Sequence, residues 1–144
     1  MTYAEKVTWL RRYRSALAEE RRLRDAIKIA RARAETTTQA MRSAPGGSDG
    51  TDKVATGVEL LDEYRRQLTA QLAQSERLRA EIEAAIASLP DAAQRHVLLA
   101  RYIDGAAWWQ VANQLYMSER WVRMLHQKAV KNLQTVPASS ALQC

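Results

Sequence analysis

Side chains that suit hydrogen bonding to nucleic acid gather in one short stretch near the C-terminus. Arginine can bond the O6 and N7 of guanine, glutamine an adenine edge and glutamate a cytosine amine, whereas lysine and hydroxyl groups suit phosphate. We therefore expect Arg120 and Arg123 to read the bases of double-stranded DNA. A solvated charged surface is the alternative for this stretch. The same chemistry adds Glu119 and Gln127 on the base side, and Met124 joins them by its position on the helix. Three contacts to the DNA backbone are also expected, from Ser118, Lys128 and Lys131.

An apolar pattern around these side chains predicts two short helices joined by a tight turn. Its positions are those that a helix-turn-helix must bury: Val111, Ala112, Leu115, Met117, Val122 and Leu125. Ala112 is small where the two helices cross at a steep angle. The Ser118 hydroxyl can accept a bond from a free backbone N–H and so cap the second helix. A basic second helix after such a turn is typical of the recognition helix of a DNA-binding unit.

The apolar face of the second helix predicts which side chains point away from the core. We expect the base-reading residues on the side opposite to four inward-facing residues, Val122, Leu125, Ala129 and Leu133. His126 is expected to be a half-buried packing residue rather than a metal ligand or a catalytic group. One of Trp108 and Trp109 must face the core, and Trp121 is expected to lean on the first helix of the motif.

Composition limits the fold and the class of protein. The 144 residues include no Phe, 5 Gly and 3 Pro, so helix is favoured nearly throughout and we expect an all-α fold. Because no long apolar run and no signal-like N-terminus occurs, we expect a cytoplasmic protein. The single Cys144 forms no internal disulfide. Paired acids, a nucleophile with its base, metal-ligand spacing and a glycine loop are all lacking, so we expect no metal, no cofactor and no enzymatic activity.

Two long amphipathic helices are expected before the motif, at residues 3–41 and 53–88. Apolar residues recur in both at roughly helical spacing, with a phase shift near Ser75 in the second. Residues 43–51, rich in Gly and Ser with one Pro, are expected to form a flexible loop between them. The expected apolar stripes are Tyr3, Val7, Leu10, Leu17, Ile27 and Ala34 in the first helix, and Val54, Val58, Leu61, Leu68, Leu72, Leu78, Ile82 and Ile86 in the second.

The charges of these two helices favour an antiparallel hairpin over residues 1–88. Residues 1–42 hold eleven Lys or Arg against five Asp or Glu, and residues 43–89 hold five against eight. A hairpin buries both stripes and opposes these charges, but pairing between chains satisfies the same pattern, so a homodimer through the hairpin stays open. We expect the arginines from Arg11 to Arg24 to pair mostly with the acidic helix, with contact to the DNA backbone as the alternative.

A compact C-terminal unit is expected at residues 89–136, followed by a disordered tail at 137–144. Pro90 ends the preceding helix and suits the first turn of a new one. Within the unit, the pattern predicts three helices, with a turn at Asp104-Gly105 after the first, near residues 90–103, 107–115 and 118–134.

Several short motifs in this unit occur together in one known family. They are Leu89-Pro90, Arg95 with Val97-Leu98, the run Arg101-Tyr-x-x-Gly105, Val111-Ala112 and Ser118-x-x-x-Val122. With them, residues 89–133 resemble region 4 of bacterial sigma factors, and the resemblance implies promoter DNA and the flap of RNA polymerase as partners. Two positions depart from that family. Ala107 stands where Ser or Thr usually caps the first motif helix, and Tyr116 stands where Gly often adopts a left-handed backbone.

The whole chain resembles small phage and prophage regulators of the ArpU type, which carry a sigma-like region 4 behind an N-terminal helical extension. Arg101-Tyr102-Ile103, a Trp in the first motif helix, and Arg123 followed by His126 and Ala129 carry this resemblance. It implies a bacterial, nucleoid-associated protein that is a sequence-specific transcription regulator and acts at promoters with RNA polymerase. A hairpin stands where a full sigma factor melts promoter DNA, so complete sigma activity is not expected.

Two other functions stay as alternatives to regulation. One is a phage DNA-packaging subunit that recognises DNA, like a small terminase, with a helix-turn-helix and an oligomerising hairpin. The other is an interaction protein that uses the sigma-like fold to occupy polymerase without reading a DNA sequence.

Overall fold

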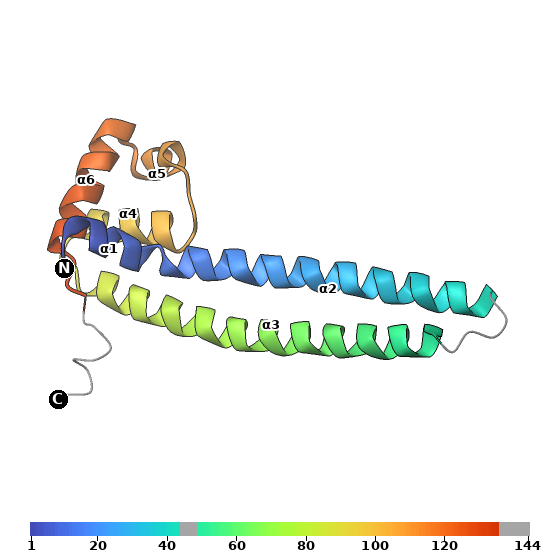
Figure 1. Ribbon diagram of the computed structural model, residues 1–144. Helices are drawn as coiled ribbons and strands as arrows, with labels where there is room; N and C mark the ends of the chain where they lie inside the picture. Colours follow the sequence, from blue (N-terminus) through green and yellow to red (C-terminus); the bar gives the residue numbers. More distant parts are fainter. Residues whose placement is uncertain (44–48, 136–144) are drawn as a thin grey trace, which may run out of the picture. The chain divides into compact units, whose positions relative to one another are not determined.

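The computed structural model describes residues 1–43 and 49–135, and the regular structure of these residues is entirely α-helical, which confirms the expected fold class. The expectations for residues 44–48 of the loop and for residues 136–144 lie outside this part of the chain. The helices, in chain order, are α1 Tyr3–Leu10, α2 Arg12–Ser43, α3 Asp49–Ala87, α4 Ala92–Tyr102, α5 Trp108–Leu115 and α6 Glu119–Asn132 (Figure 1).

Contacts group the chain into two compact units. One contains residues 1–15 together with 75–144, and the other contains residues 16–74. All of the first 88 residues were expected in the hairpin, and the contacts group the N-terminal helix and the end of the second long helix with the C-terminal helices. No helix in the described residues is long and apolar enough to cross a membrane.

The first long helix, expected without interruption over residues 3–41, is divided at Arg11, so that prediction was wrong in this detail. α1 ends at Leu10 and α2 begins at Arg12, yet backbone bonds of 3.0 Å still join Arg11 N to Val7 O and Ser15 N to Arg11 O. Arg11 itself has a right-handed helical backbone conformation, so the break is a local irregularity between two helices that follow one another directly. No Gly or Pro marks it in the sequence, which is why the apolar pattern did not predict it.

The second long helix begins earlier than expected. α3 starts at Asp49 rather than at residue 53, so residues 49–51, predicted as part of the loop, are helical. Helix propensity is a weak prior that neighbouring turns of a long helix can override. At the other end, Arg95 holds the corner that follows α3, because its Nη1 donates to Leu89 O at 2.6 Å and to Pro90 O at 3.0 Å.

Helices α2 and α3 pack antiparallel as a hairpin, as expected (Figure 1). Buried positions recur at steps of three, four or seven residues in each helix, the spacing of a coiled-coil seam. They are Tyr13, Ala16, Glu20, Leu23 and Ala30 in α2 and Ser75, Leu78, Ile82 and Ile86 in α3.

The expected apolar stripes were wrong at several positions. Val58 is 48% exposed, and Leu72 and Tyr3 are exposed as well. Ser75, where a phase shift was expected, is itself a buried position. The seam accepts this small polar residue and leaves larger apolar ones outside because burial follows the geometry of the helix pair rather than the hydrophobicity of each residue.

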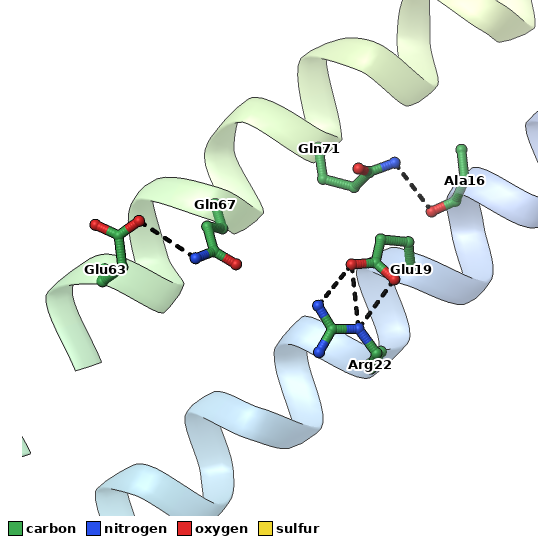
Figure 2. A network of polar contacts seen from close by, with 6 residues as sticks. All are labelled: Ala16, Glu19, Arg22, Glu63, Gln67 and Gln71. Atoms are coloured by element: carbon green, nitrogen blue, oxygen red, sulfur yellow. Dashed lines mark hydrogen bonds and ion pairs between the residues drawn. The ribbon is translucent and has the colours of Figure 1, made fainter. Parts of the chain in front are cut away.

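Polar contacts in the unit of residues 16–74 lie mostly along single helices (Figure 2). Arg22 pairs with Glu19 at 2.7 Å, and the Gln67 amide donates to Glu63 at 3.2 Å, each within its own helix. Gln71 in α3 donates across the pair to Ala16 O in α2 at 3.4 Å.

The arginines between positions 11 and 24 were expected to pair mostly with the acidic second helix. Arg12 does so, with a guanidinium nitrogen 3.2 Å from Glu81 of α3. Arg22 and Arg24 instead pair with Glu19 and Glu20 of their own helix. The exposed pair of Arg22 and Glu19, at i,i+3, contributes little to stability because water screens the attraction between the two charges.

Helices α4, α5 and α6 begin and end within two residues of the bounds predicted from the sequence. Asp91 caps α4, since its carboxylate accepts from Ala93 N at 3.1 Å, so Pro90 precedes the helix rather than opening its first turn. The turn to α5 contains Gly105 with φ of +72°, and an added Cβ there would lie 2.5 Å from the Arg14 guanidinium. Gly105 therefore provides both the left-handed backbone and the space for Arg14.

Candidate nucleic-acid interface

The two C-terminal helices stand on a small apolar core. It contains Val97 and Ala100 of α4, Val111 and Ala112 of α5 and Val122 of α6, with Leu115, Met117 and Leu125 packed against it. All six apolar positions predicted for the helix-turn-helix are thus in the core or packed on it. Ala112 is 5% exposed. A small residue buried there permits the close approach of α5 and α6.

Helix α6 divides into a buried face and an exposed face as predicted. Val122, Ala129 and Leu133 are buried and Leu125 is half-buried, while Val130 and His126 add to the buried side. The exposed residues of α6 and its cap include every residue predicted to contact DNA: Ser118, Glu119, Arg120, Arg123, Met124, Gln127, Lys128 and Lys131. One helical surface therefore carries four cations and one acid.

The turn before α6 is held by its own residues. The Ser118 hydroxyl accepts from Trp121 N at 3.1 Å, which makes it the predicted N-cap, and Glu119 stands in the first turn, where a carboxylate is favoured by the helix dipole. Tyr116 adopts the left-handed conformation with φ of +55°, as its position in the motif implied. Its side chain is 97% exposed, so little packing compensates for the backbone strain.

Helix α5 begins without a side-chain acceptor at its cap, because Ala107 has none. The Gln110 side chain supplies the other half of a capping box, since its Oε1 accepts from Ala107 N at 2.8 Å. The missing Ser or Thr is therefore replaced in part by a residue three positions later.

Two arginines lie against the ring of Trp108. The Arg101 guanidinium carbon is 4.2 Å from the ring centroid and that of Arg123 is 5.2 Å away, both within the range of cation–π attraction. Arg101 also donates to Ala106 O at 2.9 Å, which ties α4 to the turn before α5. Trp108 is the half-buried member of the pair Trp108 and Trp109, in agreement with the expectation that one of them faces the core. Its ring contacts the guanidinium of Arg123, a residue of the exposed face.

His126 is a buried packing residue, as predicted, and joins three helices. Its Nε2 is 2.6 Å from the Tyr102 hydroxyl of α4, its Nδ1 is 3.4 Å from the Tyr3 hydroxyl of α1, and Trp108 of α5 packs against its ring at 5.0 Å. Burial, together with the nearby positive charges of Arg101 and Arg11, lowers the pKa of His126 to about 4. A neutral imidazole donates with one ring nitrogen and accepts with the other, which suits two hydroxyl partners.

The N-terminal helix packs on the second half of α6. Besides the contact between Tyr3 and His126, Lys6 Nζ donates to Lys131 O at 3.0 Å, and Trp9 and Leu10 are buried. Sequence reasoning did not predict that α1 belongs to this unit. The pattern from Tyr3 to Leu10 was compatible with the hairpin as well, and a helical stripe does not say which surface it covers.

Exposed aromatic and apolar side chains also occur on this unit. Trp109 is 56% exposed, and Trp121, Tyr116 and Met124 are exposed as well. Trp109 is thus the outward member of its pair, while Trp121 is 48% exposed, so about half of its surface is covered. Within the described residues, no group of three His, Cys, Asp or Glu side chains is arranged to hold a metal ion.

Residues that the sequence analysis did not count as site residues support the exposed face. Arg101 was noted only as part of a motif, although it shares the Trp108 ring with Arg123. Arg101 lies in α4 and Arg123 in α6, so their separation in the sequence gives no periodic signal, and only the fold brings them together.

Comparison with known proteins gives one family. Its model, described as a protein of unknown function (DUF1492), matches residues 39–134, which contain α3 to α6. Neither a curated protein nor a solved structure matches the chain. The matched region covers well over half of the sequence, and the chain belongs to the DUF1492 family of unknown function.

Proposed function

We propose that this protein is a sequence-specific DNA-binding transcription regulator of phage or prophage type, acting at promoters with RNA polymerase. The observation that carries the proposal is the exposed face of α6, on which Arg120, Arg123, Lys128 and Lys131 project from a helix fixed by its own core. An α-helix with basic and amide side chains at its N-terminal end fits the major groove of B-DNA.

Arg120 and Arg123 are the proposed base readers. Both are exposed in the first two turns of α6, the part of a recognition helix that approaches base edges. Arg123 is already held against Trp108, so less side-chain entropy is lost when its guanidinium bonds a guanine. Glu119, Met124 and Gln127 share the exposed side and complete the proposed reading surface.

Backbone contacts are proposed for three further residues. Lys128 and Lys131 are exposed on later turns of α6, where an ammonium group can approach phosphate without reading a base. Ser118 uses its oxygen to cap α6 and keeps a hydroxyl hydrogen that can be donated to a phosphate oxygen.

RNA polymerase is proposed as a second partner because the unit resembles sigma region 4. The exposed Trp109 and Tyr116 support a protein contact, since large aromatic side chains outside a core are enriched at protein interfaces. If this is correct, Trp109→Ala weakens capture of purified polymerase and leaves binding to isolated DNA unchanged. Loss of DNA binding in that variant with polymerase capture intact would contradict this assignment.

Repeated selection of random double-stranded DNA by the full chain tests the main proposal. A single consensus sequence should emerge at moderate salt, and the double variant Arg120→Ala/Arg123→Ala should retain DNA without enriching it. Arg31→Ala, which removes the same kind of charge from an exposed position of α2, is the matched control and should enrich the wild-type consensus. Failure of the wild-type chain to enrich any sequence would reject sequence-specific binding.

A further inference from the structure

An apolar groove lies between α2 and α3 in the unit of residues 16–74. Its volume is about 350 Å³, and its lining includes Ile29, Ala30 and Arg33 from α2 and Leu60 and Tyr64 from α3. Ile29 is 54% exposed and Leu60 is 46% exposed. These two large aliphatic side chains on the rim of the groove form a local apolar patch, and its contact with water is unfavourable.

The helices on the two sides of this groove carry opposite charge. Residues 21–33 of α2 contain six Lys or Arg and one Asp, whereas residues 55–64 of α3 contain three Asp or Glu and no Lys or Arg. Arg22 pairs with Glu19 of its own helix, and Glu63 pairs with Arg66 of its own helix. Neither of these two ion pairs joins the basic segment of α2 to the acidic segment of α3. A hairpin that has a basic segment in one helix and an acidic segment in the facing helix is complementary in charge to a second copy of itself.

We propose that a second copy of this chain docks on the groove, with α2 of each copy against α3 of the other. A two-fold axis parallel to the hairpin creates this pairing and makes the basic-to-acidic contact twice. An axis across the hairpin would instead place α2 on α2 and oppose like charges, which is unfavourable. The apolar rim residues are buried between the two copies, as in a four-helix bundle.

The charge pattern also explains why the occupant is another copy rather than nucleic acid. DNA presents negative charge throughout, and the three acidic residues within 55–64 of α3, the helix on one side of the groove, would repel it. A copy of the chain offers the matching acid and base in the right order. This inference does not depend on whether α6 binds DNA.

Sedimentation equilibrium of the full chain over a wide concentration range tests the proposal. We expect a monomer–dimer equilibrium whose dissociation constant rises with salt, because opposite charges stabilise the dimer. Ile29→Gln and Leu60→Gln should each weaken the dimer by about tenfold, since each removes an aliphatic side chain from the contact. Val58→Gln is the matched control, since Val58 is similarly exposed on α3 but does not line the groove, and it should leave the equilibrium unchanged.

Charge reversal gives a second and independent arm. Arg33→Glu, in the groove, should weaken the dimer more than Lys28→Glu, which changes an exposed residue of the same helix outside the lining. Helical circular dichroism should be the same for all variants. A wild-type chain that stays monomeric at its highest soluble concentration would overturn the proposal, and so would equal effects of the groove variants and their controls.

Discussion

Tyr116 and Ser118 show how single residues set the geometry of the proposed interface. Ser118 fixes the first turn of α6 through its bond to Trp121 N, and Tyr116 reverses the chain just before it with φ of +55°. A left-handed backbone costs a residue with a Cβ about 1 kcal/mol or more. The turn therefore stores strain at a position where the side chain is almost fully in solvent.

Tyr116→Gly is expected to stabilise the protein by about 1 kcal/mol, because glycine adopts this backbone without strain. Chemical denaturation of the two proteins under the same conditions measures the difference. Lys128→Gly, at an exposed position inside α6, should instead destabilise by about 0.7 kcal/mol. A destabilised Tyr116→Gly variant would show that the Tyr116 side chain contributes more than its exposure indicates.

Lys131→Ala is expected to weaken binding to specific and random DNA by the same factor and to reduce the salt dependence of both. Lys131 is exposed on the last turns of α6, where a phosphate contact releases a counterion without reading sequence. Binding measured at several salt concentrations gives the slope for each DNA. A change in preference between the two DNAs would assign Lys131 to base reading instead.

At the scale of the helices, the hairpin seam combines apolar packing with buried polar residues. Ser75 is 2% exposed, and its hydroxyl has no hydrogen-bond partner among the described residues. A buried hydroxyl without a partner costs roughly 1–3 kcal/mol of desolvation. The unpaired hydroxyl of Ser75 therefore lowers the stability of the hairpin seam relative to an apolar residue at this position.

Ser75→Ala should raise the free energy of unfolding by about 1 kcal/mol, because it removes the unpaired hydroxyl and raises helix propensity. Thermal unfolding followed by circular dichroism measures the gain. The control is Ser88→Ala, which removes a hydroxyl that donates to Ala85 O at 2.6 Å and should not stabilise. A less stable Ser75→Ala protein would indicate that the hydroxyl is paired in solution.

The sequence predicted the C-terminal helices well because their apolar positions, caps and turn residues agree with one another. Ser118, Ala112 and Gly105 each have a local signal, and the structure places each as expected. The hairpin stripes were predicted less well, since Ser75 is buried and Leu72 is exposed. A seam between long helices is set by the pairing of two surfaces, which a single apolar pattern does not contain.

At the scale of the whole molecule, residues far apart in the sequence form one unit. Tyr3 and Lys6 from the N-terminal helix contact His126 and Lys131 of α6, so the N-terminus supports the helix that carries the proposed interface. The family match begins only at residue 39. α1 therefore lies outside the residues that match the family, although it packs on α6, which lies within them.

Stability is expected to fall between about pH 6.5 and pH 4 because of His126. Its pKa is near 6.5 in the unfolded chain and about 4 in the folded protein, so the unfolded state binds the extra proton in this range. The free energy of unfolding is therefore unaffected by this group above pH 6.5. It decreases by up to about 3 kcal/mol as the pH falls through the folded pKa of His126. Denaturation of the wild type and of His126→Leu at several pH values measures it. An equal pH dependence in both proteins would assign the effect to other groups.

The central claim is that α6 reads a DNA sequence, and the ratio of binding constants for specific and random DNA tests it most directly. With the full chain and a fragment carrying the selected consensus, Arg123→Ala should reduce the free-energy preference for specific DNA by about 1–3 kcal/mol, which lowers this ratio roughly fivefold to 150-fold. Arg31→Ala, an exposed arginine on α2, should leave it unchanged. Equal binding of the wild type to both DNAs, or an unchanged ratio for Arg123→Ala and for Arg120→Ala, would contradict the claim.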